Sequence, residues 1–244
     1  MLHAYHRYGE RVNSYDALKF LAIVLMTLDH VGAYFYPDEM LWRVAGRICV
    51  PLWFFFIGYS SHRQLRADIW IIGLLMVPLD PLTGGGWFSL PILLTMCLTR
   101  WLLTLAEDRE LLTKEPLAIW VASLVFAAPT YFLFEYGTFG VMLAALGVIK
   151  RKGLDEPAHQ AFWWLSIISF TAAQCVAFPF GYAEQGLVVL GILGVSLTLK
   201  RFTITPLKTQ PTTLIAAPIK LTARYSLYYY AIHKTALQIV GKLL

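Results

Sequence analysis

The chain has 244 residues, of which 58% are hydrophobic and only 14% are charged, and its mean hydropathy is +0.60. Soluble domains average about 25% charged residues, so this composition excludes an ordinary soluble protein and favours an integral membrane protein. The net charge of +5 does not indicate a nucleic-acid-binding protein, because the basic residues lie in short segments between apolar stretches.

Nine apolar segments have about the length that a helix needs to cross a bilayer, which is roughly 20 residues. We therefore predict an all-α, polytopic bundle of transmembrane helices that forms one domain over residues 1–244. The predicted spans are 15–36, 45–61, 68–82, 87–106, 116–134, 137–150, 160–179, 184–199 and 223–241. The loop before the last span could hide a re-entrant segment with the sequence LIAAPI. Residues 1–14 lack the apolar region of a cleavable signal peptide, so we expect the first span to be retained.

The basic residues of the loops support this arrangement and give its orientation. On one set of alternate loops there are 14 Lys and Arg residues, whereas the other set has only Arg43 and Lys242. Because Lys and Arg concentrate in cytoplasmic loops, the sequence predicts a cytoplasmic N-terminus and a C-terminus outside.

The first predicted span carries four ionisable residues: Asp16, Lys19, Asp29 and His30. At 100° per residue, Asp16, Lys19 and His30 share one stripe of the helix, and Asp29 is rotated by about a quarter turn from His30. A charged group at the centre of a membrane helix costs on the order of 2.5–3.5 kcal/mol, so such groups usually face a protein interior or an aqueous path. We interpret His30 as a proton-accepting group in a substrate channel. The alternative is a polar stripe that only helps the helices to pack.

Other polar residues lie within or beside later spans. Arg47 could pair with Asp29 or stabilise an oxyanion. Arg100 is expected to extend its side chain to the membrane surface. His233, in the last span, could belong to a site or form a structural hydrogen bond, and Glu135 is expected to be solvated in an outer loop. The sequence contains no motif for a metal site, a phosphate-binding loop or a serine nucleophile.

Two parts of the sequence resemble a known family. The segment from Asp16 to His30, which ends in LDH, and the following AGRICVPLWFFFIGYSSHR are similar to the first two spans of TraX-family proteins, the conjugation-associated pilin acetylases. The last predicted span, YSLYYYAIHKTAL, resembles the C-terminal helix of that family. The spacing from Asp16 to His30 also resembles the wider membrane acyltransferase superfamily. Its glycan-acylating members have Arg at the position of Lys19. The lysine of this chain would replace a bidentate guanidinium contact with a single point charge.

The resemblance implies an enzyme of the bacterial inner (cytoplasmic) membrane. It would transfer an acetyl group from cytoplasmic acetyl-CoA to the N-terminal amine of a pilin subunit, without a metal. On this basis His30 is expected to be the general base, Asp29 its orienting or charge-balancing partner and Arg47 the electrostatic stabiliser, with His233 lining the same cavity. The residues expected near the bound CoA are Asp16, Lys19, Arg63 and Arg66. The expected partners are the pilin subunit and membrane lipids.

Two other classes of function remain open at this point. One is a membrane O-acetyltransferase that acts on a surface glycan or a lipid-linked sugar. The other is a non-enzymatic carrier in which His30 and Asp29 relay protons, although the inverted repeat typical of such carriers is not evident. A structural accessory of a secretion machine would leave the buried charges without a role.

Overall fold

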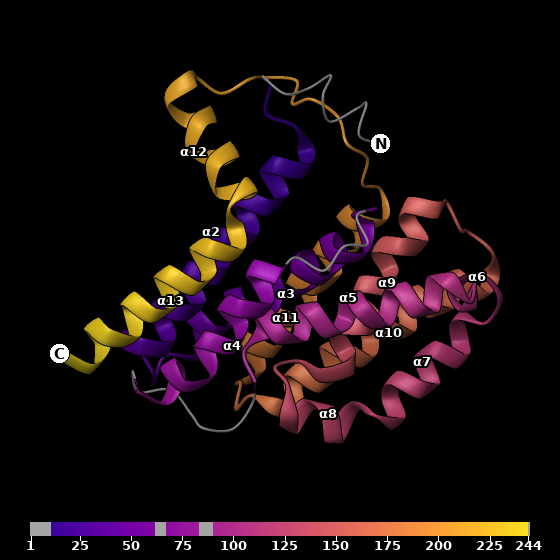
Figure 1. The fold of residues 1–244 in the computed structure, drawn as a ribbon, viewed down its shortest axis with the longest axis horizontal. Helices are drawn as coiled ribbons and strands as arrows, with labels where there is room; N and C mark the ends of the chain where they lie inside the picture. Colours follow the sequence, from indigo (N-terminus) through magenta and orange to yellow (C-terminus); the bar gives the residue numbers. More distant parts are fainter. Residues whose placement is uncertain (1–10, 62–66, 83–89, 244) are drawn as a thin grey trace.

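The structure, a computed structural model, describes residues 11–61, 67–82 and 90–243. These residues form helices joined by connecting segments. The described residues also form two isolated β-bridges, one between Asn13 and Pro206 and one between Leu90 and Phe134. The helices are α2 (Ser14–Phe35), α3 (Met40–Tyr59), α4 (Ala67–Leu82), α5 (Ile92–Asp108), α6 (Leu111–Lys114), α7 (Pro116–Val125), α8 (Ala127–Leu133), α9 (Gly137–Lys152), α10 (Pro157–Ala177), α11 (Tyr182–Lys200), α12 (Thr213–Arg224) and α13 (Ser226–Leu243) (Figure 1). The predicted all-α class is confirmed.

Several helices are suited to a membrane. Among the described residues, α2, α3 and α11 are long and apolar enough to cross a bilayer, and the bent pair of α7 and α8 would make a fourth span if it crosses as one unit. Large apolar side chains also lie exposed on other helices; Val176 in α10 is 87% exposed and Leu190 in α11 is 67% exposed. Such surfaces are stable in lipid rather than in water. The chain is therefore a membrane protein, and the total of nine spans stays a prediction.

Two segments differ from the sequence-based expectation. The predicted span 116–134 is two helices, α7 and α8, that meet at Phe126 with a bend of 60°. Pro129 explains the break, because a proline lacks the backbone N–H and its ring clashes with the carbonyl group four residues earlier. The loop expected at 202–221 contains most of α12.

Helix α3 lies at the centre of the bundle and packs against α2 and α9. Its side chains Leu52, Phe54 and Phe55 are almost completely buried. The backbones of α3 and α9 approach closely: a Cβ atom at Gly58 would lie 1.7 Å from the carbonyl oxygen of Ala144. Small residues at such crossings allow membrane helices to gain van der Waals contact.

The end of the chain returns to its beginning. In Figure 1, α13 (yellow) lies along α2 (indigo), and α12 (orange-gold) contacts α2 at an angle to it. At the start of α2, the Lys19 ammonium donates a hydrogen bond to the carbonyl of Ala223 in α12, at 3.1 Å. Near the end of α2, His30 meets His233 of α13. The polar contact at His30 is therefore made jointly by α2 and α13, the last described helix.

Candidate functional site

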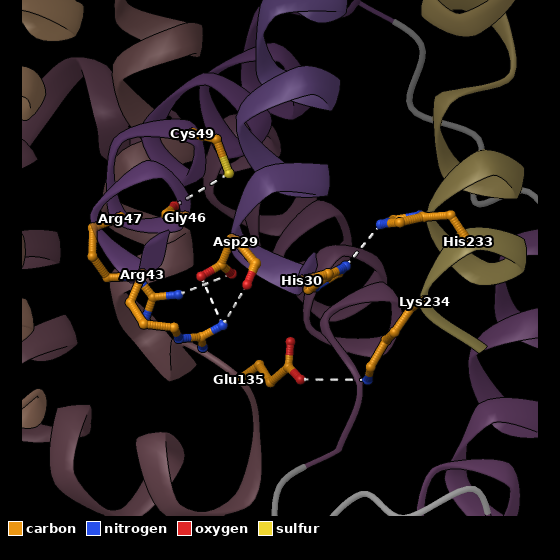
Figure 2. A network of polar contacts seen from close by, with 9 residues as sticks. All are labelled: Asp29, His30, Arg43, Gly46, Arg47, Cys49, Glu135, His233 and Lys234. Carbon is orange, nitrogen blue, oxygen red and sulfur yellow. Dashed lines mark hydrogen bonds and ion pairs between the residues drawn. The ribbon is translucent and has the colours of Figure 1, made fainter. Parts of the chain in front are cut away.

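The site is centred on two histidines from α2 and α13. Nδ1 of His30 lies 2.7 Å from Nε2 of His233, and the two rings stack with centroids 4.8 Å apart (Figure 2). Nδ1 of His233 lies 2.7 Å from the carbonyl oxygen of Tyr229. A carbonyl oxygen can only accept a hydrogen bond, so Nδ1 of His233 carries its proton.

This contact assigns the tautomers of both rings from the hydrogen-bond network. When His233 is neutral and protonated on Nδ1, its Nε2 is an acceptor, and His30 must donate from Nδ1. The lone pair of His30 then lies on Nε2. The arrangement leaves a basic nitrogen on α2 whose orientation is set by α13.

Asp29 points to a different partner, although it precedes His30 in the chain. Its Oδ1 lies 2.7 Å from Nη1 of Arg43, and its Oδ2 lies 3.5 Å from Nη2 of Arg47. Arg43 also donates to the backbone carbonyl of Asp29, at 3.0 Å. Arg43 and Arg47 are four residues apart on α3, so both side chains reach the same face of that helix.

Gly46 makes this contact between α2 and α3 possible. A Cβ atom at residue 46 would lie only 2.3 Å from Cγ of Asp29 and 2.5 Å from each carboxylate oxygen. Any larger residue would push the carboxylate away from the two guanidinium groups. Gly46 therefore leaves room for the carboxylate of Asp29, and the next residue, Arg47, places a cation beside that carboxylate.

Arg47 is held in an aromatic environment away from solvent. Its side chain is 4% exposed, and its guanidinium carbon lies 4.1 Å from the ring centre of Phe178 and 5.7 Å from that of Tyr136. A cation over an aromatic face is stabilised by the ring quadrupole, more strongly when it is desolvated. In such a setting a fixed positive charge acts strongly on a nearby developing negative charge.

A second ion-pair group follows His233 on α13. The ammonium of Lys234 lies 2.8 Å from Oδ2 of Asp80 in α4 and 4.0 Å from Oε1 of Glu135, which precedes α9. One turn later on α13, Nε2 of Gln238 donates a hydrogen bond to Oδ1 of Asp80, at 3.4 Å. In Figure 2 the contact between Glu135 and Lys234 lies just below His30. The last helix is thus tied to α2 by a histidine and to α4 by an ion pair.

Of the residues predicted near CoA, the structure describes Asp16 and Lys19, and both lie away from this site. Asp16 and Asn13 form a capping box at the start of α2, in which the side chain of each accepts a hydrogen bond from the backbone N–H of the other. Lys19 is one turn further along. Both lie at the opposite end of α2 from His30, as the predicted stripe requires, while Arg63 and Arg66 lie outside the described residues.

The structure gives contacts for three residues, Asp29, Glu135 and Arg100, that the sequence analysis did not foresee in full. The carboxylate of Asp29 lies against Arg43 and Arg47, which includes the pair expected with Arg47, and the contact with Nδ1 of His30 is made by His233. Glu135 is not simply solvated, because the fold brings it to Lys234.

Arg100 has backbone partners at the end of α3. It donates to the backbone carbonyls of Ile57 and Ser60 at the end of α3, the second at 3.1 Å. The last carbonyls of a helix lack partners within the helix, which explains this contact.

Sequence reasoning missed two members of the cluster. Arg43 was taken as a loop residue because the second span was expected to begin at Ala45, whereas α3 begins at Met40. The interval of four between Arg43 and Arg47 was the available signal. Asp80 stands alone in an apolar segment between two prolines, and a charge in such a place predicts a buried partner. Among the described residues, no group of His, Cys, Asp and Glu could hold a metal ion.

Comparison with known proteins gives the family. The family model described as "TraX protein" matches residues 14–241, which extends from the first residue of α2 to within three residues of the C-terminus. The chain belongs to the TraX family. It is also 39% identical over 66 residues to an uncharacterized protein of Rickettsia prowazekii (strain Madrid E), and this match covers 27% of each chain. No solved structure matches the chain. The family match confirms the resemblance read from the first two spans and the last one.

Proposed function

We propose that this TraX-family chain is an acetyltransferase of the bacterial inner membrane. It would move the acetyl group of cytoplasmic acetyl-CoA to the N-terminal amine of a membrane-inserted pilin subunit. The observation that carries the proposal is the contact between His30 and His233, which places an oriented imidazole in a cluster of charges inside a membrane protein. Membership of the TraX family supports the assignment to conjugation-related acetylation.

The proposed reaction is an acyl transfer with His30 as general base. An α-amino group has a pKa of about 7.7–8.0 and must lose a proton before its nitrogen can attack a carbonyl carbon. Nε2 of His30 takes a proton from the attacking amine as the new C–N bond forms. The C–S bond of the thioester then breaks, and the proton passes to the leaving CoA thiolate. His233 keeps Nδ1 of His30 occupied, so that only Nε2 is available as the base.

Arg47 and Arg43 are proposed to stabilise the tetrahedral intermediate. Their guanidinium groups are held in place by Asp29, so they need little reorganisation as negative charge develops on the carbonyl oxygen. One preorganised donor of this kind is worth about 2.7–4 kcal/mol in other acyl-transfer enzymes. In this role Asp29 positions the arginines rather than the histidine.

The donor is proposed to enter from the side on which basic residues gather. With nine spans and a cytoplasmic N-terminus, 14 basic loop residues would face the cytoplasm, where the polyanionic acetyl-CoA is found. Lys19, Arg63 and Arg66 remain the proposed contacts of the CoA phosphates, and Asp16 holds the start of the helix that carries Lys19. The acetyl group would travel along the α2 stripe to His30.

The test is transfer of radiolabel from acetyl-CoA in membranes of the native host, with and without the chain. We expect label in a small membrane protein, at its N-terminal amine. Label in polysaccharide would instead establish the O-acetyltransferase, since the same base could activate a hydroxyl group. Absence of chain-dependent label with donor and host acceptors present would contradict both and favour the carrier.

A further inference from the structure

Helix α12 has an apolar face that the rest of the described structure leaves uncovered. Leu214 is 89% exposed, Leu221 is 61% exposed, and Tyr225 just beyond the helix is 45% exposed. Together with Pro218 these residues recur at intervals of three and four, so they lie on one side of the helix. The opposite side carries Ala223, which is 2% exposed and packs toward α2.

A basic side chain lies at the end of this face, and two more lie in the segments that precede α2 and α12. Arg224 is exposed at the end of α12, and its guanidinium carbon lies 5.6 Å from the ring centre of Tyr225. Two more exposed cations, Arg11 and Lys208, flank a backbone contact in which the N–H of Leu207 donates to the carbonyl of Val12 at 3.1 Å. The loop before α12 and the segment before α2 thus bring positive charge together at one end of the bundle.

The position of α12 in the fold agrees with this distribution. Figure 1 shows α12 at the margin of the bundle, beside the beginning of α2 and at an angle to α13. The helix has 12 residues, which is too short to cross a bilayer. A short helix with an apolar face and flanking cations is typical of one that lies in the membrane interface.

We propose that α12 and the loop before it form a binding surface for anionic phospholipids. Leu214 and Leu221 would lie at the boundary of the acyl chains, with Arg11, Lys208 and Arg224 among the phosphate headgroups. The combination of an apolar stripe with cations on its border matches the two chemistries of an anionic lipid. This surface does not depend on the proposed acetyl transfer.

The first test measures the depth of α12 in the bilayer. In a Cys175→Ala background, Leu214→Cys carries a spin label on the full chain in vesicles of phosphatidylcholine and phosphatidylglycerol; the other two native cysteines are buried. We expect the label to collide with oxygen more often than with a water-soluble nickel chelate. A label that is freely accessible to the chelate would overturn the proposal. If the label is accessible to the chelate in vesicles but protected from it in native membranes, a protein partner covers this face instead, and the proposal is equally overturned.

The second test measures lipid selectivity. Spin-labelled phosphatidylglycerol is compared with spin-labelled phosphatidylcholine for association with the reconstituted chain. Lys208→Gln with Arg224→Gln should lower the selectivity by about two-fold or more, and salt should lower it in the wild type. The matched control is Arg109→Gln with Lys114→Gln, which removes two exposed charges near α6, away from α12. Equal selectivity in the two double variants would overturn the proposal.

Discussion

His30 and His233 are 203 residues apart in the chain, yet Nδ1 of the first lies 2.7 Å from Nε2 of the second. Since Tyr229 fixes the proton of His233 on Nδ1, the last helix determines which nitrogen of His30 is basic. In the proposed mechanism, a second imidazole has the orienting role that a carboxylate has in many catalytic sites. The neighbouring Asp29 forms ion pairs with the two arginines of α3.

Replacing His30 by Ala should abolish most of the acetyl transfer. Loss of a general base lowers rates by about 10²–10⁴-fold. Radiolabel transfer from acetyl-CoA measures the effect, after insertion and thermal stability of the variant have been checked. His159→Gln is the control, because His159 is also buried but contacts the carbonyl of Leu112, far along the chain from the cluster. Full activity of the His30 variant would remove this residue from the mechanism.

Replacing His233 by Gln should reduce kcat less than replacing His30, and should alter the pH profile of kcat. The amide cannot reproduce both the contact with His30 and the one with Tyr229, so the two tautomers of His30 would be mixed. The KM for acetyl-CoA should stay close to the wild-type value, because His233 orients the base and is not proposed to bind the donor. A raised KM with an unchanged pH profile would argue against a positioning role.

Gly46→Ala should destabilise the protein, because the new Cβ atom would lie 2.3 Å from Cγ of Asp29. Overpacking of this kind typically costs about 1–3 kcal/mol. The matched control is Gly194→Ala in α11, where a Cβ atom would meet nothing within 4 Å. The control should be neutral or slightly stabilising, because alanine is favoured over glycine within a helix. Thermal unfolding in detergent compares the two, and equal midpoints would show that α3 can shift away from Asp29.

Lys234→Met should be strongly destabilising, because it removes the buried ammonium that pairs with Asp80 at 2.8 Å and lies 4.0 Å from Glu135. Removing one member of a buried ion pair typically costs about 3–5 kcal/mol. Adding Asp80→Leu to this variant should restore part of the lost stability, since the buried carboxylate that paired with Lys234 is removed with it.

The control for this experiment is Lys114→Met. Lys114 pairs with Glu110 at 2.7 Å, but both side chains are more than half exposed, so only a small change is expected. A Lys234 variant as stable as this control would mean that the ion pair with α4 contributes little to the fold.

Much of the fold could be predicted from the sequence because the signals are local. Apolar length predicted helices, and every predicted span overlaps a helix of the structure. The break at Phe126 was missed because the apolar run continues across it and Pro129 gives only a local warning. Helix α12 was not predicted, because most of it was placed in the loop before the last span and only LIAAPI was considered there as a re-entrant segment.

The sequence by itself determined that this is a membrane protein of the TraX type, with ionisable residues at set heights in its first and last helices. Composition, helical period and motif depend only on neighbours along the chain. The sequence suggested Arg47 as a partner of Asp29 and placed His233 in the same cavity as His30. The tertiary structure decided the direct contact of the two histidines, the addition of Arg43 beside Asp29, and Asp80 with Glu135 as partners of Lys234. Such pairings depend on how helices far apart in sequence rotate and approach, down to the space left by Gly46, and local patterns carry no information about that.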